Sequence, residues 1–160
     1  MPEVLLSLGS NIEPQQHLDQ AMQALLELPG LGAVRESTRY KAPAVGFDGP
    51  DFVNSAVHAQ WQGELGTLQA ALQAIEDAAQ RDRSAPRFSS RTLDIDIVLF
   101  GDLITSAGSG LPRAELLQCA FVLRPCAEMA PNWLHPQTGQ TLAAHWAQWQ
   151  AAKPDPLLPL

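Results

Sequence analysis

Two aspartates, Asp94 and Asp96, stand at alternate positions in an apolar run near the middle of the chain. Alternate residues of a β-strand share a face, so the carboxylates are expected on one face, about 7 Å apart. The apolar residues are expected on the other: Leu93, Ile95, Ile97 and Leu99. So close a carboxylate pair needs a cation or an arginine beside it. Carboxylates completed by substrate phosphates are the usual Mg²⁺ ligands in proteins, so the pattern favours a Mg-nucleotide site. An ordinary sheet with one solvated face is the alternative.

Positive charge is concentrated directly upstream of this pair. Four of the ten lysines and arginines lie there: Arg81, Arg83, Arg87 and Arg91. The chain as a whole carries a formal net charge of -7. An acidic protein that places guanidinium groups beside two carboxylates suggests a polyphosphate held by both metal and arginine. A solvated loop with surface ion pairs is the alternative that the spacing alone leaves open.

The length of 160 residues is typical of a single domain, 1–160. No run of some 18 apolar residues is present, and the start of the chain lacks the basic stretch and cleavage site of a signal peptide, so we expect a cytoplasmic protein. The two cysteines, Cys119 and Cys126, are too few for a disulfide framework and lack zinc-site spacing, so both are expected in the core. A pI near 4.9 does not suit the broad basic face that nucleic acids require. The expected partners are small molecules.

Hydrophobic periodicity predicts elements in the order β-α-β-β-α-β. Strands are expected at 4–8, 34–41, 52–61 and 91–100, the last of them central, and helices at 13–28 and 65–79. We also expect helices at 114–119 and 141–150, a short hairpin arm at 103–104, and a frayed tail at 154–160. Helices packed on a largely antiparallel sheet in this order form an α+β, ferredoxin-like sandwich with extra C-terminal helices.

Polar and flexible residues near these strands suggest a ligand pocket. The segment 42–50 holds two prolines and two glycines and is expected to form a lid or a pocket wall. Asn54 is an amide in a strand otherwise built for burial, and its donors and acceptor complement the hydrogen-bonding edge of a heterocycle. A turn-capping or backbone-bonded asparagine is an equal alternative. Gly9 either makes a turn or lets a planar ligand approach the backbone.

Several short motifs, in order along nearly the whole chain, together resemble one family: 6-hydroxymethyl-7,8-dihydropterin pyrophosphokinase of folate biosynthesis. Each motif is modest, and their joint occurrence is specific. The matching pieces are Leu8-Gly9-Ser10-Asn11, Tyr40-Lys41-Ala42-Pro43, Pro50-Asp51-Phe52-Val53-Asn54-Ser55-Ala56-Val57, Ile75-Glu76, the arginine segment, Arg91-Thr92-Leu93-Asp94-Ile95-Asp96 and Ala120-Phe121-Val122-Leu123-Arg124-Pro125.

The resemblance implies transfer of the β,γ-diphosphate of ATP to the pterin hydroxymethyl group, giving AMP and a pterin diphosphate. It implies a monomer with Asp94 and Asp96 binding two Mg²⁺ ions, and with Arg81 and Arg91 as further catalytic residues on the phosphates. The implied nucleotide-binding residues are Glu76, Arg81, Arg83, Arg91, Ile97 and Arg113. The implied pterin-binding residues are Pro43, Val45, Phe52, Asn54 and Phe121.

The chain departs from the family pattern in the ATP-binding segments. Ser89-Ser90 stand where the family has Gly-Pro, Phe88 replaces a tryptophan, Arg113 replaces a histidine and Cys119 replaces a basic residue. Arginine can replace the hydrogen bonds of histidine but not its titration. A diverged paralogue that binds pterin with weak or altered transfer is therefore a second hypothesis. A ferredoxin-like RNA-binding module is a third, but it requires sheet aromatics and a basic face that the sequence lacks.

Overall fold

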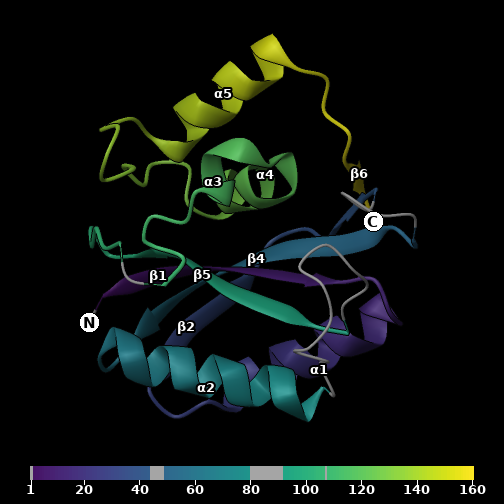
Figure 1. Cartoon of the computed structure of the whole chain (residues 1–160), viewed down its shortest axis with the longest axis vertical. Helices are drawn as coiled ribbons and strands as arrows, with labels where there is room; N and C mark the ends of the chain where they lie inside the picture. Colours follow the sequence, from purple (N-terminus) through teal and green to yellow (C-terminus); the bar gives the residue numbers. More distant parts are fainter. Residues whose placement is uncertain (1, 44–48, 80–91, 107) are drawn as a thin grey trace.

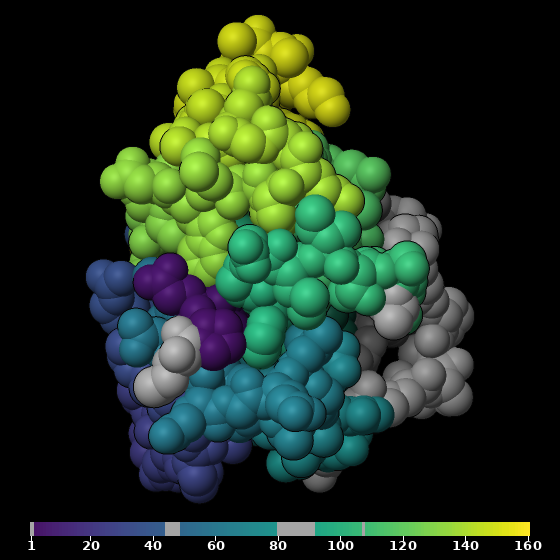
Figure 2. Space-filling view, turned by 90° about the vertical axis from the view of Figure 1, so that its left-hand side faces the viewer, coloured from purple at the N-terminus to yellow at the C-terminus, as the bar shows by residue number. Residues whose placement is uncertain are grey.

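The computed structural model describes residues 2–43, 49–79, 92–106 and 108–160. Helices α1 (Pro14–Glu27) and α2 (Leu65–Ala78) cover one face of a sheet, and α4 (Ala120–Met129) covers the other (Figure 1). The short α3 (Glu115–Gln118) precedes α4, and α5 (Leu142–Ala152) packs on α4 as an outer layer. Figure 2 shows the C-terminal third, green to yellow, stacked over the N-terminal part of the chain. Within the described ranges, no helix combines the length and the apolar character needed to cross a membrane.

The sheet is antiparallel, with its strands in the order β5-β1-β4-β3-β6 and with β2 also pairing β4. Its strands are β1 (Glu3–Ser10), β2 (Leu31–Glu36), β3 (Tyr40–Ala42), β4 (Phe52–Trp61), β5 (Asp94–Phe100) and β6 (Leu158–Pro159). The predicted βαββαβ order is confirmed, although the second predicted strand is divided into β2 and β3. The strand predicted to be central, β5, is instead an edge strand beside β1.

Two apolar cores lie on the two faces of the sheet, as strand alternation requires. The core under α1 and α2 contains Val4, Leu6, Leu8, Val57, Ile95 and Ile97. The core under α4 contains Leu5, Ala56, Val98, Leu99, Leu123 and Cys126. Each buried leucine of these cores contributes roughly 2 kcal/mol of hydrophobic stabilisation. The described sheet therefore has no fully solvated face.

Leu99 was predicted to share a face with Ile95 and Ile97, and this was wrong. The register with β1 passes from Leu6 opposite Ile97 to Leu5 opposite Leu99, so that Val98 is skipped. Such a bulge places two successive residues on the same side of a strand. Leu99 consequently joins Val98 in the core under α4.

The end of the chain is ordered against the sheet, so the predicted frayed tail was wrong. Strand β6 pairs with β3, with Pro159 opposite Tyr40 and Leu158 opposite Lys41. The Leu160 amide donates to the Arg39 carbonyl at 2.9 Å. The predicted hairpin arm at 103–104 was also wrong, because these residues lie outside any strand and the local bridge joins Thr105 to Leu111.

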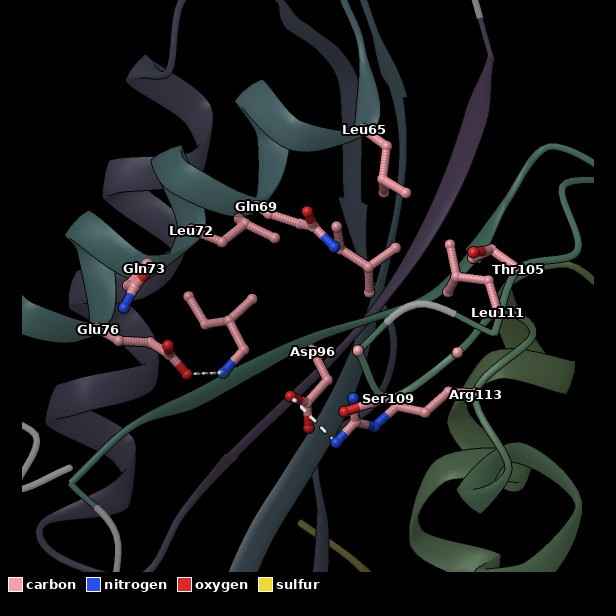
Figure 3. Close-up of a pocket in the computed structure, with 14 residues that line it drawn as sticks. Leu65, Gln69, Leu72, Gln73, Glu76, Asp96, Thr105, Ser109, Leu111 and Arg113 are labelled. Atoms are coloured by element: carbon pink, nitrogen blue, oxygen red, sulfur yellow. Dashed lines mark hydrogen bonds and ion pairs between the residues drawn. The ribbon is translucent and has the colours of Figure 1, made fainter. Parts of the chain in front are cut away.

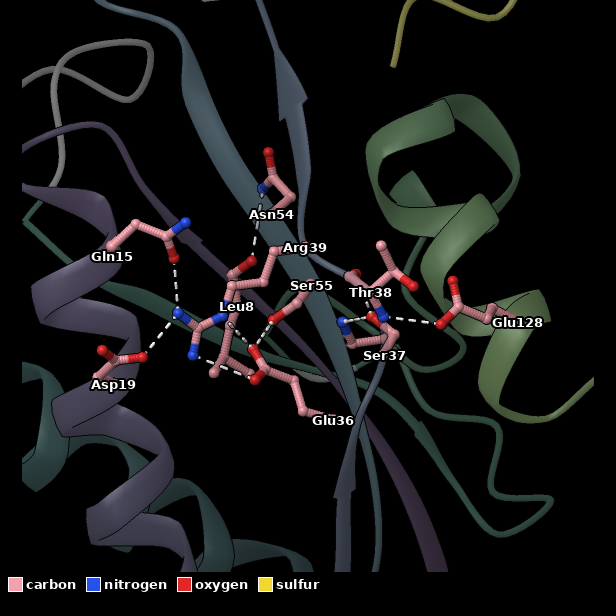
Figure 4. Close-up of polar contacts among 11 residues, drawn as sticks. Leu8, Gln15, Asp19, Glu36, Ser37, Thr38, Arg39, Asn54, Ser55 and Glu128 are labelled. Carbon is pink, nitrogen blue, oxygen red and sulfur yellow. Dashed lines mark hydrogen bonds and ion pairs between the residues drawn. The ribbon is translucent and has the colours of Figure 1, made fainter. Parts of the chain in front are cut away.

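An ion-pair network centred on Arg39 fixes the bend between β2 and β3 (Figure 4). Its guanidinium donates to both Glu36 carboxylate oxygens at 2.9 and 3.1 Å, to Asp19 at 2.8 Å and to Gln15 at 2.7 Å. The Ser55 hydroxyl of β4 also donates to Glu36, at 2.7 Å. Burial alone would lower the pKa of Arg39, but the hydrogen bonds and charges of Glu36 and Asp19 outweigh it and raise that pKa. The network holds β3 in place beside β4.

Candidate active site

A row of polar positions crosses three strands at one end of the sheet face that α4 covers. Gly9 of β1 lies between Asp94 of β5 and Asn54 of β4. In the next row, Ser7 lies opposite Asp96. Ala56 completes that row on β4, and further along the strands Leu5 and Val98 belong to the apolar core under α4. Polar groups in an otherwise apolar sheet face are the arrangement expected of a binding site.

The predicted alternation along β5 is confirmed from Asp94 to Ile97. Ile95 and Ile97 are buried in the core under α1 and α2, whereas Asp94 and Asp96 are only partly buried. The alternative of an ordinary solvated sheet face does not describe this pair, because α4 covers the same face further along. The side chain of Asp96 is 38% exposed and opens into a cleft.

The cleft has a volume of about 560 Å³, with β5 as its floor. Helix α2 lines one side with Leu65, Gln69 and Gln73, and the segment 108–113 lines the other together with Thr105 (Figure 3). Its size and its mixture of apolar and polar groups are typical of small-molecule sites. Three residues predicted for nucleotide binding lie together on its wall, next to Asp96: Glu76, Ile97 and Arg113.

Arg113 places a positive charge next to the cleft aspartate. Its Nη2 lies 3.6 Å from Asp96 Oδ1, while its Nε lies 2.8 Å from Glu115 Oε2. Its backbone amide donates to the Val98 carbonyl at 3.0 Å, which fixes the segment against β5. The guanidinium is therefore held between two carboxylates at a point from which it can reach an anionic ligand in the cleft.

Glu76 holds the strand that carries the two aspartates. Its carboxylate is 5% exposed and accepts a hydrogen bond from the Ile95 amide at 2.8 Å. Ile95 is the residue between Asp94 and Asp96, and β5 is an edge strand of the sheet. The Glu76 carboxylate thus accepts the hydrogen bond that a backbone carbonyl of a further strand would otherwise accept. Glu76 contributes to the site by fixing the backbone between the two aspartates.

Glu76→Gln and Glu76→Leu are expected to differ sharply in their effect on the free energy of unfolding. The glutamine keeps an acceptor oxygen, so stability stays within about 1 kcal/mol of the wild type. The leucine leaves the buried Ile95 amide without this acceptor, so unfolding free energy falls by about 1–3 kcal/mol. Thermal unfolding and hydrogen exchange of the Ile95 amide check this. Equal losses in both variants would mean that the charge of Glu76, not its hydrogen bond, matters.

Asn54 presents a buried and unsatisfied acceptor. The residue is 6% exposed, its Nδ2 donates to the Leu8 carbonyl at 3.5 Å, and its Oδ1 has no hydrogen-bond partner in the described structure. The backbone-bonded alternative is thus partly confirmed, through one long contact. An unpaired buried acceptor costs about 1–3 kcal/mol, and a ligand that donates to it would remove that cost.

Gly9 makes room for this amide. It lies inside β1, so the predicted turn at this glycine was wrong. A Cβ at Gly9 would lie 2.7 Å from Asn54 Nδ2, closer than real contacts allow. Only glycine therefore leaves the Asn54 side chain in its observed position.

The remaining predicted ligand residues are distributed as follows. Phe52 begins β4, Phe121 lies in the first turn of α4, and both are partly buried, whereas Pro43 is exposed at the end of β3. Val45, Arg81, Arg83 and Arg91 lie outside the described residues, as does Arg87. Both cysteines were expected in the core; Cys126 is buried and Cys119 is half-buried.

Sequence reasoning missed part of the cleft wall. Leu65, Gln69 and Gln73 stand four residues apart and therefore share one face of α2, and that spacing was the available signal. Thr105 and Ser109 also line the cleft. They lie in irregular backbone, for which the sequence has no periodic signal.

One protein family and several curated proteins are similar in sequence to this chain. The family 7,8-dihydro-6-hydroxymethylpterin-pyrophosphokinase (HPPK) matches residues 5–131. The 2-amino-4-hydroxy-6-hydroxymethyldihydropteridine pyrophosphokinase of Pseudomonas aeruginosa is 37% identical over 132 residues, which cover 81% of each chain. The protein of the same name from Synechocystis sp. is 33% identical over 140 residues, which cover 86% of this chain and 71% of the relative.

A solved structure supports the fold. Wild-type HPPK-DHPS of Plasmodium falciparum, solved with pterin and p-hydroxybenzoate, superposes with a TM-score of 0.72 at 12% identity. The match covers 92% of this chain but 43% of that one, so this chain spans less than half of the solved protein. At this identity the likeness concerns the fold alone. It supports the predicted α+β, ferredoxin-like sandwich.

Proposed function

Since this chain belongs to the 7,8-dihydro-6-hydroxymethylpterin-pyrophosphokinase family, we propose that it is a pyrophosphokinase of folate biosynthesis with ATP as co-substrate. It transfers diphosphate from ATP to the hydroxymethyl group of 6-hydroxymethyl-7,8-dihydropterin, giving AMP and the pterin diphosphate. One observation carries this proposal. The row Asp94, Gly9, Asn54 joins strand β5, whose Asp96 lines the cleft, to a buried amide with an unpaired acceptor.

The spacing of the row suits two substrates that must meet. Neighbouring strands lie about 4.8 Å apart, so Asp94 and Asn54, two strands apart, are separated by about 10 Å. Asn54 reads the hydrogen-bonding edge of the pterin, and Phe52 and Phe121 enclose its ring, with Pro43 and Val45 as further proposed contacts. The hydroxymethyl group then points along the row towards the phosphates in the cleft. Holding two reactants in line accounts for much of phosphoryl-transfer catalysis.

Asp94 and Asp96 are the residues that would hold two Mg²⁺ ions, making this a Mg-dependent diphosphotransferase. Among the described residues, no group of three or more His, Cys, Asp and Glu is arranged for a metal. A carboxylate pair nevertheless fits Mg²⁺, which usually keeps water and phosphate ligands beside one or two carboxylates. When bound, the ions supply neutralisation of the phosphate charge. The carboxylates themselves orient the site, because they project from a strand that Glu76 fixes.

The phosphates are also expected to meet arginine side chains. Arg113 faces the cleft next to Asp96, and Arg81, Arg83 and Arg91 are proposed partners from outside the described residues. Guanidinium groups can donate two parallel hydrogen bonds to a phosphate, and they stabilise the negative charge that spreads over the transferred group. Ile97 contributes an apolar contact on the same wall.

Arg113→His is expected to keep the rate of AMP formation within about tenfold of the wild type, or to raise it. The histidine can still donate a hydrogen bond to phosphate, and the ion pair with Asp96 is relieved. Initial rates at saturating ATP and pterin measure the effect, with Lys153→His as an exposed control. A loss of more than about a hundredfold would show that Arg113 has acquired a role that only a guanidinium performs.

The other hypotheses have no support from the site. No observation favours a diverged paralogue that only binds pterin. A ferredoxin-like RNA-binding module needs an open sheet surface, whereas helices cover both faces of the described sheet. The monomeric state, the single domain 1–160 and the cytoplasmic location stay predictions.

A product assay tests the proposed function. Incubation of the protein with ATP, Mg²⁺ and 6-hydroxymethyl-7,8-dihydropterin should give AMP and pterin diphosphate in equal amounts, and chelation of the metal should stop the reaction. Formation of ADP, or no turnover at high protein concentration, would overturn it. Calorimetry that shows tight pterin binding without Mg-ATP binding would favour the paralogue instead.

A further inference from the structure

Residues 154–160 form a strap across the sheet edge that carries β3. Its strand β6 extends the sheet beyond β3, on the side away from β4. The strap lies beyond residues 5–131, which the family model matches. The strap is nevertheless firmly attached, through one apolar residue and one ion pair.

The apolar attachment is Leu157. Its side chain is 5% exposed and belongs to a small buried cluster with Tyr40, Ala42 and Ala120. Phe121 is partly buried against the same cluster. Leu157 is thus the only contribution of the strap to this cluster among the described residues, and the cluster packs against Phe121, one of the proposed pterin contacts.

The polar attachment is Asp155. Its Oδ2 lies 2.7 Å from Arg124 Nη1, and its Oδ1 accepts a hydrogen bond from the Leu157 amide at 3.0 Å. The Arg124 guanidinium in turn lies 4.4 Å from the centroid of the Tyr40 ring, a cation–π contact. Asp155 therefore fixes Leu157 locally and connects the strap to α4 and β3.

The Tyr40 ring is held from its other end as well. Its hydroxyl donates to the Glu128 carboxylate, which also accepts from the Thr38 amide at 2.7 Å (Figure 4). Burial, followed by the hydrogen bond to Glu128, raises the pKa of Tyr40, so the ring stays a neutral donor. The strap, α4 and β3 consequently form one packed unit.

This unit lies next to three residues that are proposed to contact the pterin ring: Asn54, Phe52 and Phe121. Tyr40 is directly opposite Asn54, and Ala42 is directly opposite Phe52. Ala120 immediately precedes Phe121. The residues lining the nucleotide cleft come from α2, from β5, and from Thr105 and the segment 108–113, at the opposite edge of the sheet. The strap therefore touches one half of the site only.

We propose that the strap is a positioning element for the pterin half of the site: through Leu157 and Asp155 it sets the placement of Asn54, Phe52 and Phe121, and thereby the affinity for the pterin. It leaves the nucleotide cleft unaffected. The inference rests on the proposed function, because it takes the pterin as the ligand of that half. It assigns to residues outside the family match a specific role in substrate binding.

Leu157→Ala and Leu158→Ala provide a matched test, because the two leucines are adjacent but Leu158 is 64% exposed. In the full chain, Leu157→Ala should weaken pterin binding, measured by calorimetry without nucleotide, about tenfold, as small displacements of positioning groups do. The KM for pterin should rise in parallel, and the KM for ATP should stay within about twofold. Leu158→Ala should change neither constant by more than about twofold.

Four outcomes would be decisive. Unchanged pterin affinity in Leu157→Ala would overturn the inference and leave the strap a purely stabilising role. Equal losses for pterin and ATP would overturn it too, because they indicate general loosening. If Leu157→Ala does not fold, Asp155→Ala takes its place, and its pterin affinity should fall about threefold with ATP unaffected; no change there would equally overturn the inference. Absence of pterin binding in the wild type would instead contradict the proposed function.

Discussion

Replacing either Asp94 or Asp96 by asparagine should abolish diphosphate transfer while the protein stays folded. Each substitution keeps the size of the side chain but removes a negative charge that the proposed metal ions require. Both side chains are partly exposed and lie outside the two apolar cores, so little packing is lost. We expect the rate of AMP formation to fall by about a thousandfold or more, as it does when a preorganised electrostatic group is lost from an active site.

The measurement is the initial rate of AMP formation with Mg²⁺, combined with thermal unfolding of each variant. Asp102→Asn is the matched control, because Asp102 lies exposed in the turn that follows the same strand. It should keep the wild-type rate. Calorimetry should also show that the active-site variants bind Mg-ATP more weakly than the control. Variants that unfold at lower temperature but retain their rate would show that the two aspartates are structural.

Local patterns in the sequence predicted the shared face of these two aspartates for a clear physical reason. The alternation of Asp94, Ile95, Asp96 and Ile97 is a property of any strand and needs no knowledge of its neighbours. The same holds for the apolar faces of α1 and α2, whose helical spacing matches the buried residues Leu18, Leu25, Leu68 and Leu72. One-dimensional periodicity was therefore sufficient for these two helices and for the alternation of the carboxylate pair.

Features that depend on pairing between distant segments could not be predicted in this way. The face of Leu99 is set by a bulge against β1, and the order of residues 154–160 is set by pairing with β3, more than a hundred positions earlier. The glycine at position 9 predicted a turn, but a glycine is required there because the Asn54 side chain of the neighbouring strand leaves no room for a Cβ. In each case a contact made by tertiary structure outweighed the local preference.

Asn54 is the site residue whose replacement should separate binding from stability most clearly. Asn54→Leu keeps the branched shape of the side chain but removes the amide, so pterin affinity should fall by about a hundredfold or more, because a site built to hydrogen-bond a ligand loses that discrimination. Stability should stay the same or rise, because the unpaired buried Oδ1 disappears. A buried polar group that costs stability and serves binding is a known form of trade-off between stability and activity.

Pterin calorimetry and thermal unfolding test this pair of effects, with ATP affinity as the internal reference. Asn132→Leu, at an exposed position, should change neither quantity. Gly9→Ala probes the same amide from the other strand: its Cβ would meet Asn54 Nδ2 at 2.7 Å, so pterin affinity and stability should both fall. If Asn54→Leu is strongly destabilised but binds pterin normally, the amide serves the fold. The ring must then be recognised elsewhere, and the row from Asp94 to Asn54 would no longer define how the two substrates meet.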